Sequence, residues 1–283
     1  MKFIKKGILT TYLDQGKNGL RHLGVNPAGA MDKYTVKLLN ILLQKEETEP
    51  VIEMHFPAPE IFFEEDCTII IGGANFTPTI DNQLISNWKA VEVKAISVLK
   101  FNQKVTGNRA YLAVTNQKNK LFLPYLGNMG QVTNLSVMPE IRFIQGNEFD
   151  LLTPKSKLNM ENQSFMIAQH SNRMGYRMKS QPLELGEKKE LVSAAVDFGT
   201  MQLLPDGQII VLMADHQTSG GYPRIGNVIS TDLPKLAQLG PNDSIQFKQI
   251  TIEEAEDLIM SEDKQLQKLK SSIKFFNEKN QIY

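Results

Sequence analysis

The sequence predicts a mainly β protein whose strands roll up or close on themselves, with a few helices. Most of its 283 residues fall into short apolar runs separated by Gly, Pro, Asn and Asp, a pattern typical of strands joined by turns. Helical spacing of apolar residues is confined to two segments, and helices do not alternate with the strands. These observations favour a closed or rolled β architecture over an alternating βαβ fold.

Each predicted strand is a short apolar run bounded by turn-forming residues. The runs are Val51–Phe56, Ile61–Phe63, Thr68–Ile71, Ala110–Val114, Glu140–Ile144, Phe165–Ala168 and Ile209–Met213. Their spacing along the chain is irregular, and no internal repeat of fixed period links them.

The first predicted helix begins after Asp32, a good N-cap residue, and ends near Leu43. Val36, Leu39 and Leu43 share one face. Asn40 lies on or beside that face, so we expect a buried amide that is hydrogen-bonded to backbone, because an unpaired one would cost about 1–3 kcal/mol.

The second predicted helix lies near the C-terminus. Thr251-Ile252-Glu253-Glu254 matches a capping box. Apolar residues then recur at helical spacing from Ile252 to Ile273. The segment forms either one long helix or two helices that break near Ser261-Glu262-Asp263.

The length allows one large domain or two smaller ones. The polar stretch Thr153–Gln163 is the best candidate for a boundary, and Gln181–Lys189 is the next. Both stretches could equally be exposed loops of a single domain.

Charge and composition exclude several classes of protein. The 31 basic and 31 acidic residues balance, so no basic field indicates a nucleic acid or an anionic membrane as partner. The N-terminal segment lacks the apolar core of a secretory signal, and no run approaches the roughly 18 apolar residues of a membrane span. We expect a soluble cytoplasmic protein.

The single cysteine, Cys67, lies in an apolar strand-like run, where we expect a buried, inert thiol. One cysteine excludes disulfides and cysteine-based metal sites within the chain. His22, His55, His170 and His216 show no ligand spacing, so a zinc site has little support.

A loop with four glycines, Gly16–Asp32, precedes the first helix. Such a loop can hold an anion through its free backbone N–H groups. It matches neither a Walker loop nor a dinucleotide fingerprint. The alternative is structural: the glycines supply positive φ angles and Asp32 caps the helix.

Two arginines, Arg173 and Arg177, flank Gly175-Tyr176. Paired guanidinium groups suit carboxylate or phosphate recognition. Alternatively, the arginines brace loops against acidic neighbours.

The most informative segment is the turn Asp215–Pro223, DHQTSGGYP, between two apolar runs. It gathers a carboxylate, an imidazole, an amide, two hydroxyls and a phenol around Gly220-Gly221, far more than a tight hairpin requires. This composition predicts a site on a scaffold. Ser219 lacks the Gly-x-Ser-x-Gly elbow of serine hydrolases.

Six segments occur together in the order of one family. They are Gly16–Asp32, Glu53, Gly107–Val114, Ser171–Arg177, Gly199–Gln202 and Met213–Gln238. The chain resembles the family of the 5-oxoprolinase C subunit (PxpC), the KipI antagonist KipA and allophanate hydrolase subunit 2, which forms part of the carboxyltransferase domain of urea carboxylase. The resemblance reaches about Phe247 and is strongest at Asp215–Pro223, followed by Gly226 and Asp232.

The resemblance implies a cyclophilin-like β-barrel architecture and a single carboxyltransferase-like domain over residues 1–283. It also implies a complex with two further chains, a KipI-like B subunit together with a LamB/YcsF-like A subunit. That complex would use ATP, with Mg²⁺, to open 5-oxo-L-proline to L-glutamate, and the nucleotide site could be shared with a partner.

For such a reaction we expect Asp215 or His216 to handle a proton. Arg173 and Arg177 would bind phosphate or the substrate carboxylate. The remaining substrate-binding candidates are Gln202, Gln217, Thr218 and Tyr222.

The chain departs from the family pattern at three places, the mildest of which is Phe198-Gly199 where the family has Pro-Gly. Asn116-Gln117-Lys118 stands where the family has Gly-Gly-Ile, and Leu126–Gln131 replaces Leu-Gly-Ser-Arg-Ser-Thr. If this segment touches substrate, the substrate or the activity differs.

Two alternatives stay open. One is a regulatory protein that binds a KipI-like partner and carries no chemistry. The other is a biotin-dependent carboxyltransferase component, which would need a separate carrier because the chain has no Met-Lys-Met biotin attachment segment.

Overall fold

The computed structural model describes residues 1–17, 19–116, 138–187 and 191–280. The chain divides into two compact units. The first consists of Met1–Gln15, Asp32–Asn134 and Ser261–Tyr283, and the second of Gly16–Met31 and Leu135–Met260. The mainly β fold with a closed barrel and a few helices is confirmed.

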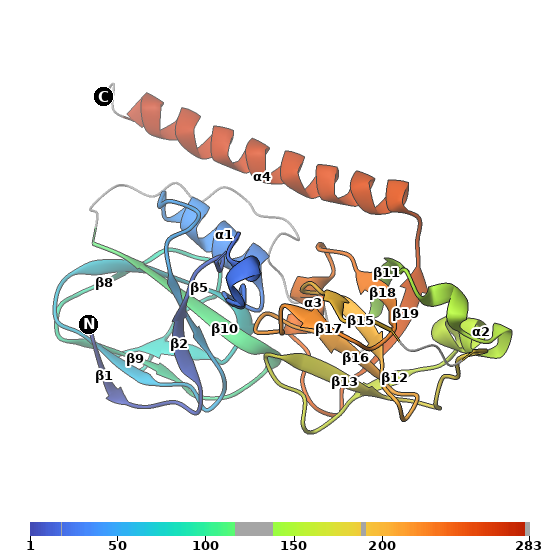
Figure 1. The fold of residues 1–283 in the computed structure, drawn as a ribbon. Coiled ribbons are helices and arrows are strands. Elements are labelled where there is room, and N and C mark those ends of the chain that lie inside the picture. The colour runs from blue at the N-terminus through green and yellow to red at the C-terminus, as the bar shows by residue number, and fades with distance from the viewer. Residues whose placement is uncertain (18, 117–137, 188–190, 281–283) are drawn as a thin grey trace. The chain divides into compact units, whose positions relative to one another are not determined.

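In the first unit, two five-stranded sheets pack face to face (Figure 1). One sheet has the order β1-β4-β9-β6-β7 and the other β2-β3-β10-β5-β8. The strands are β1 (Lys2–Lys5), β2 (Thr10–Leu13), β3 (Val51–Met54), β4 (Glu60–Phe63), β5 (Cys67–Asn75), β6 (Pro78–Ile80), β7 (Gln83–Leu84), β8 (Val91–Val93), β9 (Ser97–Phe101) and β10 (Thr106–Thr115).

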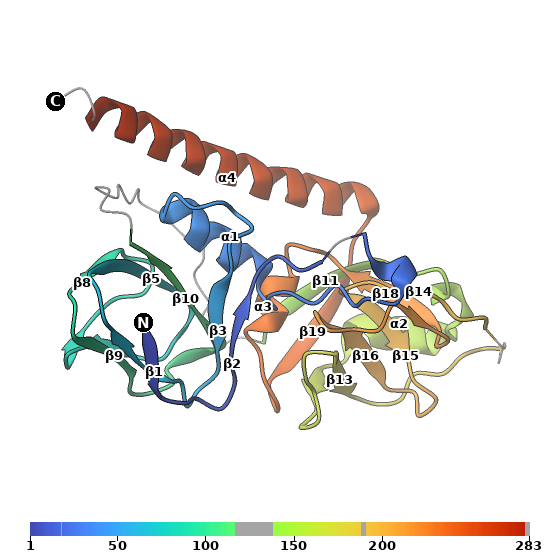
Figure 2. The same cartoon turned by 60° about the vertical axis from the view of Figure 1, so that its left-hand side comes forward.

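The core of this unit forms because apolar residues of both sheets point inward. Ile52, Phe63, Ile71 and Leu112 are at most 2% exposed. The neighbouring pair of β5 and β10 is antiparallel, with Tyr111 opposite Gly72. Figure 2 brings the N-terminus and β1 forward, at the edge of its sheet.

Helix α1 (Lys33–Leu42) packs against β5 and β10. Its N-cap is Asp32, whose carboxylate accepts from Thr35 N at 2.8 Å, as predicted. Asn40 is fully buried, and its amide donates to the carbonyls of Glu47 (3.3 Å) and Glu49 (2.7 Å). The prediction of a buried amide bonded to backbone is confirmed.

The second unit is a closed seven-stranded barrel with the order β11-β18-β15-β16-β13-β12-β19. Neighbours are antiparallel except for β11 and β19, which run parallel. The strands are β11 (Glu140–Gln145), β12 (Phe165–Ile167), β13 (Gly175–Lys179), β15 (Thr200–Leu203), β16 (Ile209–Leu212), β18 (Arg224–Val228) and β19 (Ser244–Gln249). A separate ribbon pairs β14 (Ala194–Ala195) with β17 (Ser219–Gly220).

Aromatic rings fill the barrel. Phe143 and Phe165 both contact Phe247. The ring centroid of Phe247 lies 6.0 Å from that of Phe143 and 4.9 Å from that of Phe165. All three side chains are at most 1% exposed. Burial of such large apolar surfaces is the dominant stabilising term.

The predicted strands are confirmed, although β5 and β10 extend well beyond the apolar runs that predicted them. Both continue through residues that carry little hydrophobic signal, such as Gly72-Gly73 in β5 and Gly107-Asn108-Arg109 in β10. Pairing between the two strands carries them further than composition alone indicates.

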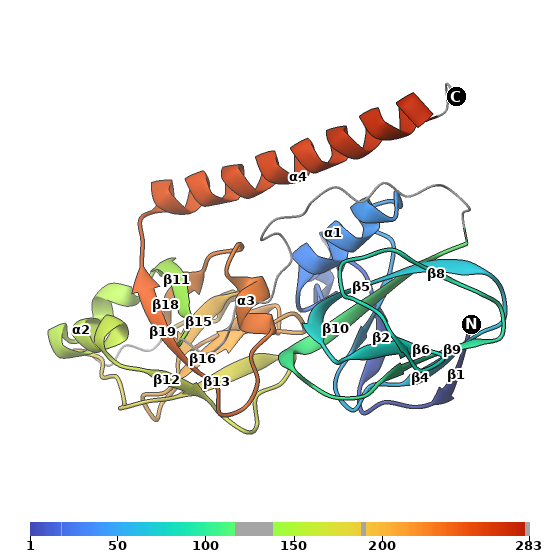
Figure 3. The ribbon, with the colours of Figure 1, turned by 180° about the vertical axis from the view of Figure 1, so that it is seen from behind.

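The stretch Thr153–Gln163 forms helix α2 (Pro154–Asn162) inside the second unit. Thr153 accepts from Ser156 N at 3.2 Å, and Pro154 occupies the first turn, an arrangement that favours helix initiation. The helix packs beside β19, as Figure 3 shows from behind. The divisions between the units fall elsewhere, near residues 15–16, 31–32, 134–135 and 260–261.

The other helices are the short α3 (Leu233–Ala237), two 3-10 turns, η1 (Arg21–Leu23) and η2 (Phe149–Leu151), and the long α4 (Ile252–Asn280). The capping box of α4 is confirmed, because Thr251 N donates to Glu254 Oε2 (2.8 Å) and Glu254 N donates to Thr251 Oγ1 (3.2 Å). The helix is one element and does not break at 261–263.

Candidate functional site

The Asp215–Pro223 turn follows β16 in the second unit and is tied to two other segments. The Asp215 carboxylate accepts two hydrogen bonds from Arg173, from Nε at 2.7 Å and Nη2 at 2.9 Å. Arg173 Nη2 also donates to Gly29 O at 2.5 Å, and Asn26 Nδ2 donates to Asp215 O at 3.3 Å. The turn, the arginine loop and the glycine loop therefore meet.

The Arg173 guanidinium is held on both sides by this arrangement, since bidentate pairing with a carboxylate fixes its plane. Arg177 behaves differently. It lies on β13 between the buried residues Tyr176 and Met178, and alternation directs its exposed side chain outward. The two arginines do not form one guanidinium pair, and Arg173 braces the loops.

All four glycines of the loop Gly16–Asp32 have positive φ angles. Gly16 has φ +88°, and a Cβ there would lie 2.5 Å from Ala28 O. Gly29 also has positive φ, at +91°. Together with the Asp32 cap, these values support the structural interpretation of this loop.

His216 is completely buried. Its Nδ1 lies 2.6 Å from Gln217 O, so this nitrogen carries the proton and donates to the carbonyl. Nε2 faces Asp197, 3.9 Å from Oδ1. Burial raises the pKa of the Asp197 carboxyl, but hydrogen bonds from Arg21 and Phe198 N and the charges of Arg21 and His216 outweigh it, so the pKa is lowered.

The amide and phenol candidates line the same turn. Gln202 is 1% exposed on β15, and its Nε2 donates to Tyr222 O at 3.4 Å. A Cβ on Gly220 would lie 2.5 Å from that Nε2, so the glycine permits the turn to pass over Gln202. Gln217 and Thr218 are half-buried, and Tyr222 is exposed. Thr218 O accepts from Val196 N at 3.3 Å, which joins the turn to the 194–197 segment.

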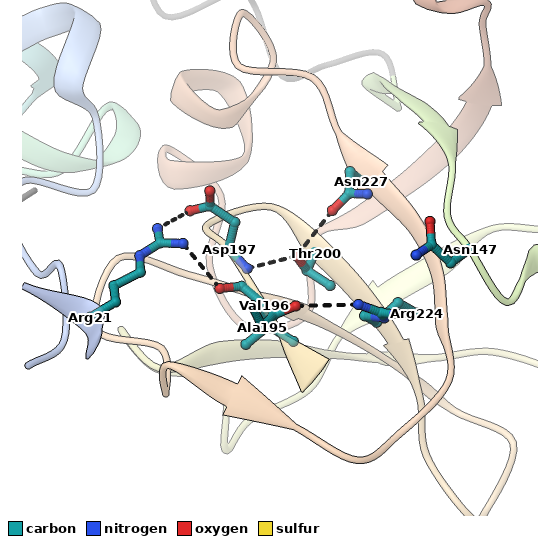
Figure 4. A pocket seen from close by; sticks show the side chains of 8 residues that line it. All are labelled: Arg21, Asn147, Ala195, Val196, Asp197, Thr200, Arg224 and Asn227. Carbon is teal, nitrogen blue, oxygen red and sulfur yellow. Dashed lines mark hydrogen bonds and ion pairs between the residues drawn. The ribbon is translucent and has the colours of Figure 1, made fainter. Parts of the chain in front are cut away.

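A polar pocket of about 230 Å³ lies beside this segment (Figure 4). Its lining consists of Arg21, Asn147, Ala195, Val196, Asp197, Thr200, Arg224 and Asn227. Arg21 is in η1, which lies beside β14 in Figure 2. The guanidinium of Arg21 pairs with the Asp197 carboxylate and also donates to Val196 O at 3.3 Å.

Arg224 is held on the opposite side of the pocket by Glu148. Its Nε, Nη2 and backbone N donate to the Glu148 carboxylate at 2.8–2.9 Å. Hydrogen bonding from Arg224 lowers the pKa of Glu148 despite its partial burial. Arg224 Nη1 also lies 3.4 Å from Ala195 O.

Sequence reasoning did not select the pocket residues Arg21, Asp197 and Arg224 as site residues. Both arginines lie within segments that carry the family resemblance, but their carboxylate partners lie 176 and 76 positions away. Arg224 directly follows Tyr222-Pro223, the end of the turn, and this position is the signal that could have marked it as a site residue.

Cys67 is partly exposed, which corrects the expectation of full burial. Partial burial, with the nearby Asp66 charge, raises the pKa of its thiol to about 11, so the thiol stays protonated near neutral pH. Across the described ranges, no group of three His, Cys, Asp or Glu side chains is arranged to hold a metal ion. No helix in the described part of the chain has the length and apolar character to cross a bilayer.

Comparison with known proteins identifies the family. The model of the carboxyltransferase domain, subdomains A and B, matches residues 23–128 and 128–249. The chain belongs to this carboxyltransferase-domain family. The match includes Arg173, the turn and most of the pocket, and Arg21 lies just before it.

Two curated members of the carboxyltransferase-domain family are similar to nearly the whole chain. The C subunit of the Haemophilus influenzae 5-oxoprolinase is 31% identical, over 88% of this chain and 90% of that protein. The C subunit of the Escherichia coli 5-oxoprolinase is 28% identical, over 90% and 93%. The crystal structure of the K. lactis urea amidolyase has TM-score 0.84 at 20% identity, and the match covers 95% of this chain and 20% of that one. This last likeness shows the fold.

The segment that departs from the family pattern lies almost wholly outside the described residues. Residues 117–137 include Gln117-Lys118 and Leu126–Gln131. Its relation to the site therefore stays a prediction.

Proposed function

We propose that this chain is the C subunit of an ATP-dependent 5-oxoprolinase that opens 5-oxo-L-proline to L-glutamate. The observation that carries the proposal is similarity to two 5-oxoprolinase C subunits over about nine-tenths of this chain. The bracing of the Asp215–Pro223 turn by Arg173 and the glycine loop supports a prearranged site. The proposed partners are a KipI-like B subunit together with a LamB/YcsF-like A subunit, in the cytoplasm.

The proposed chemistry begins with transfer of the γ-phosphoryl group of ATP to the lactam oxygen. Water then adds to the activated carbon and the ring C–N bond breaks, which leaves an acyl phosphate on the opened chain. A second water hydrolyses this acyl phosphate, so that one 5-oxo-L-proline, one ATP and two waters yield ADP, phosphate and glutamate. Half-buried Gln217 and Thr218 and buried Gln202 offer polar groups that orient the lactam. Arg173 keeps Asp215 and the turn in place.

Reconstitution tests the proposal. When this chain is co-expressed with its cognate KipI-like and LamB/YcsF-like homologues, we expect ATP hydrolysis that depends on 5-oxo-L-proline and releases one glutamate per ADP. Leaving out any one chain should abolish it. A complex that assembles without turnover would instead support a regulatory binding protein, and capture of a biotinylated partner on avidin would support a carboxyltransferase component.

Gln217→Ala should lower turnover of the reconstituted complex about two- to twelvefold, because one hydrogen bond that orients a substrate contributes about 0.5–1.5 kcal/mol. Co-purification of the three chains should be unchanged. Gln169→Ala removes an exposed amide elsewhere in the same unit and serves as the matched control. Equal rates for Gln217→Ala and Gln169→Ala would remove Gln217 from the site.

A further inference from the structure

The pocket in Figure 4 has two chemically different ends. Asp197 and Arg21 lie at one end, and Asn147, Asn227 and Arg224 lie at the other, with Thr200 between them. Each arginine is paired with a carboxylate, Arg21 with Asp197 and Arg224 with Glu148. The pocket therefore has little net charge but a separated arrangement of donors and acceptors.

The orientation of Asn227 follows from its neighbour. Thr200 Oγ1 accepts from Asp197 N at 2.9 Å and lies 3.0 Å from Asn227 Oδ1. An amide oxygen can only accept, so the Thr200 hydroxyl donates its proton to it. The Asn227 NH₂ group is thereby turned toward Asn147, as Figure 4 shows.

Arg224 adds a charged donor at the same end. A guanidinium has five N–H groups, and three of those of Arg224 donate to Glu148 and Ala195 O. Among the described residues, its other two have no acceptor. The side chains of Asn147, Asn227 and Arg224 thus surround one end of the pocket with donors, which suits a carboxylate.

The opposite end of the pocket offers a hydrogen-bond acceptor, the Asp197 carboxylate. The Asp197 side chain is 63% exposed. Partial burial raises the pKa of its carboxyl, but hydrogen bonds from Arg21 and from Phe198 N outweigh this effect and lower the pKa, so the carboxyl stays ionised. An ionised carboxylate accepts hydrogen bonds only. It suits a ligand N–H group, either of a lactam or of an ammonium.

We propose that this pocket binds a small molecule that carries a carboxylate and an N–H group, with the carboxylate at Asn147, Asn227 and Arg224 and the N–H at Asp197. The volume of about 230 Å³ lies below the range of about 300–1,000 Å³ typical of drug-sized ligands, so the ligand is about the size of an amino acid. Its assignment as the 5-oxo-L-proline site rests on the proposed function.

The test uses Asn227→Asp and Asn147→Asp, which keep side-chain shape but replace a donor with a negative charge. Binding of 5-oxo-L-proline to the assembled complex is measured by calorimetry without ATP. We expect each variant to weaken binding about 10- to 100-fold, the usual effect of losing an interaction with a charged group. Asn162→Asp, an exposed residue of α2 with the same charge change, should stay within about twofold.

Ligand chemistry provides a second comparison. 2-Pyrrolidinone, which keeps the lactam but lacks the carboxylate, should bind at least about tenfold more weakly than 5-oxo-L-proline to the wild type. Equal binding of the two compounds, or wild-type affinity in both Asn227→Asp and Asn147→Asp, would overturn the proposal.

The two proposals fail in different ways. If the wild-type complex hydrolyses ATP with 5-oxo-L-proline and both variants keep its KM, the pocket assignment is wrong and the proposed function stands. Suppose instead that the wild-type complex shows no such turnover, that the wild-type full chain binds L-glutamate and that the Asn227→Asp chain does not. The proposed function is then wrong and the pocket assignment stands. If the chain binds neither compound, the pocket assignment is wrong.

Discussion

Glu53→Ala should destabilise the first unit by about 3–5 kcal/mol, the usual cost of removing one member of a buried ion pair. Glu53 and Arg109 are 4% and 3% exposed, with Oε1 and Nε 3.7 Å apart. Glu53 Oε2 also accepts from the Tyr111 hydroxyl at 2.9 Å, which in turn accepts from Asp32 N at 3.0 Å. The substitution therefore leaves a buried guanidinium with reduced compensation and loosens the start of α1.

Urea unfolding followed by tryptophan fluorescence measures this effect, because the single tryptophan, Trp88, lies in the first unit. Glu60→Ala is the control. Glu60 pairs with Lys5 at 3.5 Å on the surface, and such pairs contribute about 0–1 kcal/mol. The double substitution Glu53→Met with Arg109→Met should recover much of the loss, since apolar residues tolerate this environment. Similar midpoints for Glu53→Ala and Glu60→Ala would contradict the interpretation.

Asp232→Asn should destabilise the second unit by about 3 kcal/mol at neutral pH. Asp232 is fully buried and accepts from Arg142 N and Nε at 2.8 Å, from Arg142 Nη2 at 2.6 Å and from Lys235 Nζ at 2.8 Å. These contacts join β11 to the start of α3. An amide of the same shape cannot satisfy the same cations.

The pH dependence of the stability difference between wild type and Asp232→Asn tests the role of the Asp232 charge more strictly. Burial raises the pKa of Asp232, but hydrogen bonds from Arg142 and Lys235 outweigh it and lower the pKa below the ordinary 3.8. A lowered folded-state pKa stabilises the protein at pH values above the unfolded-state pKa, and this contribution is lost as the pH falls below it. The gap between wild type and Asp232→Asn should therefore be constant from pH 7 to about 5 and shrink below about pH 4.

Far-UV circular dichroism in urea, at steps from pH 7 to 3, measures that gap. Asp150→Asn is the control, since its side chain is 89% exposed and its loss should change stability by less than about 0.5 kcal/mol. A gap that stays constant down to pH 3 would show that Asp232 acts through shape and not through its charge.

Local signals in the sequence were sufficient for much of the fold. The cap at Asp32 and the capping box at Thr251–Glu254 both form as predicted, because such hydrogen bonds join residues three positions apart. The helix at Pro154–Asn162 was missed although Thr153-Pro154 is a start signal. Its polar composition lacks an apolar stripe, so hydrophobic periodicity could not reveal it.

Local sequence was also sufficient for one part of the candidate site and not for the other. Its turn was recognisable because Asp215–Pro223 carries unusual chemistry within nine consecutive residues. The partner of each charge was not recognisable. The structure pairs Arg173 with Asp215, 42 positions away, and an exposed arginine and a paired one look alike in sequence. Its role as a ligand for an anion stays a prediction.

The sequence alone determined the mainly β class, the starts of two helices, the family and the unusual composition of the turn, because each depends on local order or on a motif. Only the tertiary structure decided which charges neutralise one another and where a pocket remains. Contacts such as Arg21 with Asp197 join residues 176 positions apart. They form only when folding brings η1 beside the segment between β14 and β15, so the pocket beside the turn is a property of the fold.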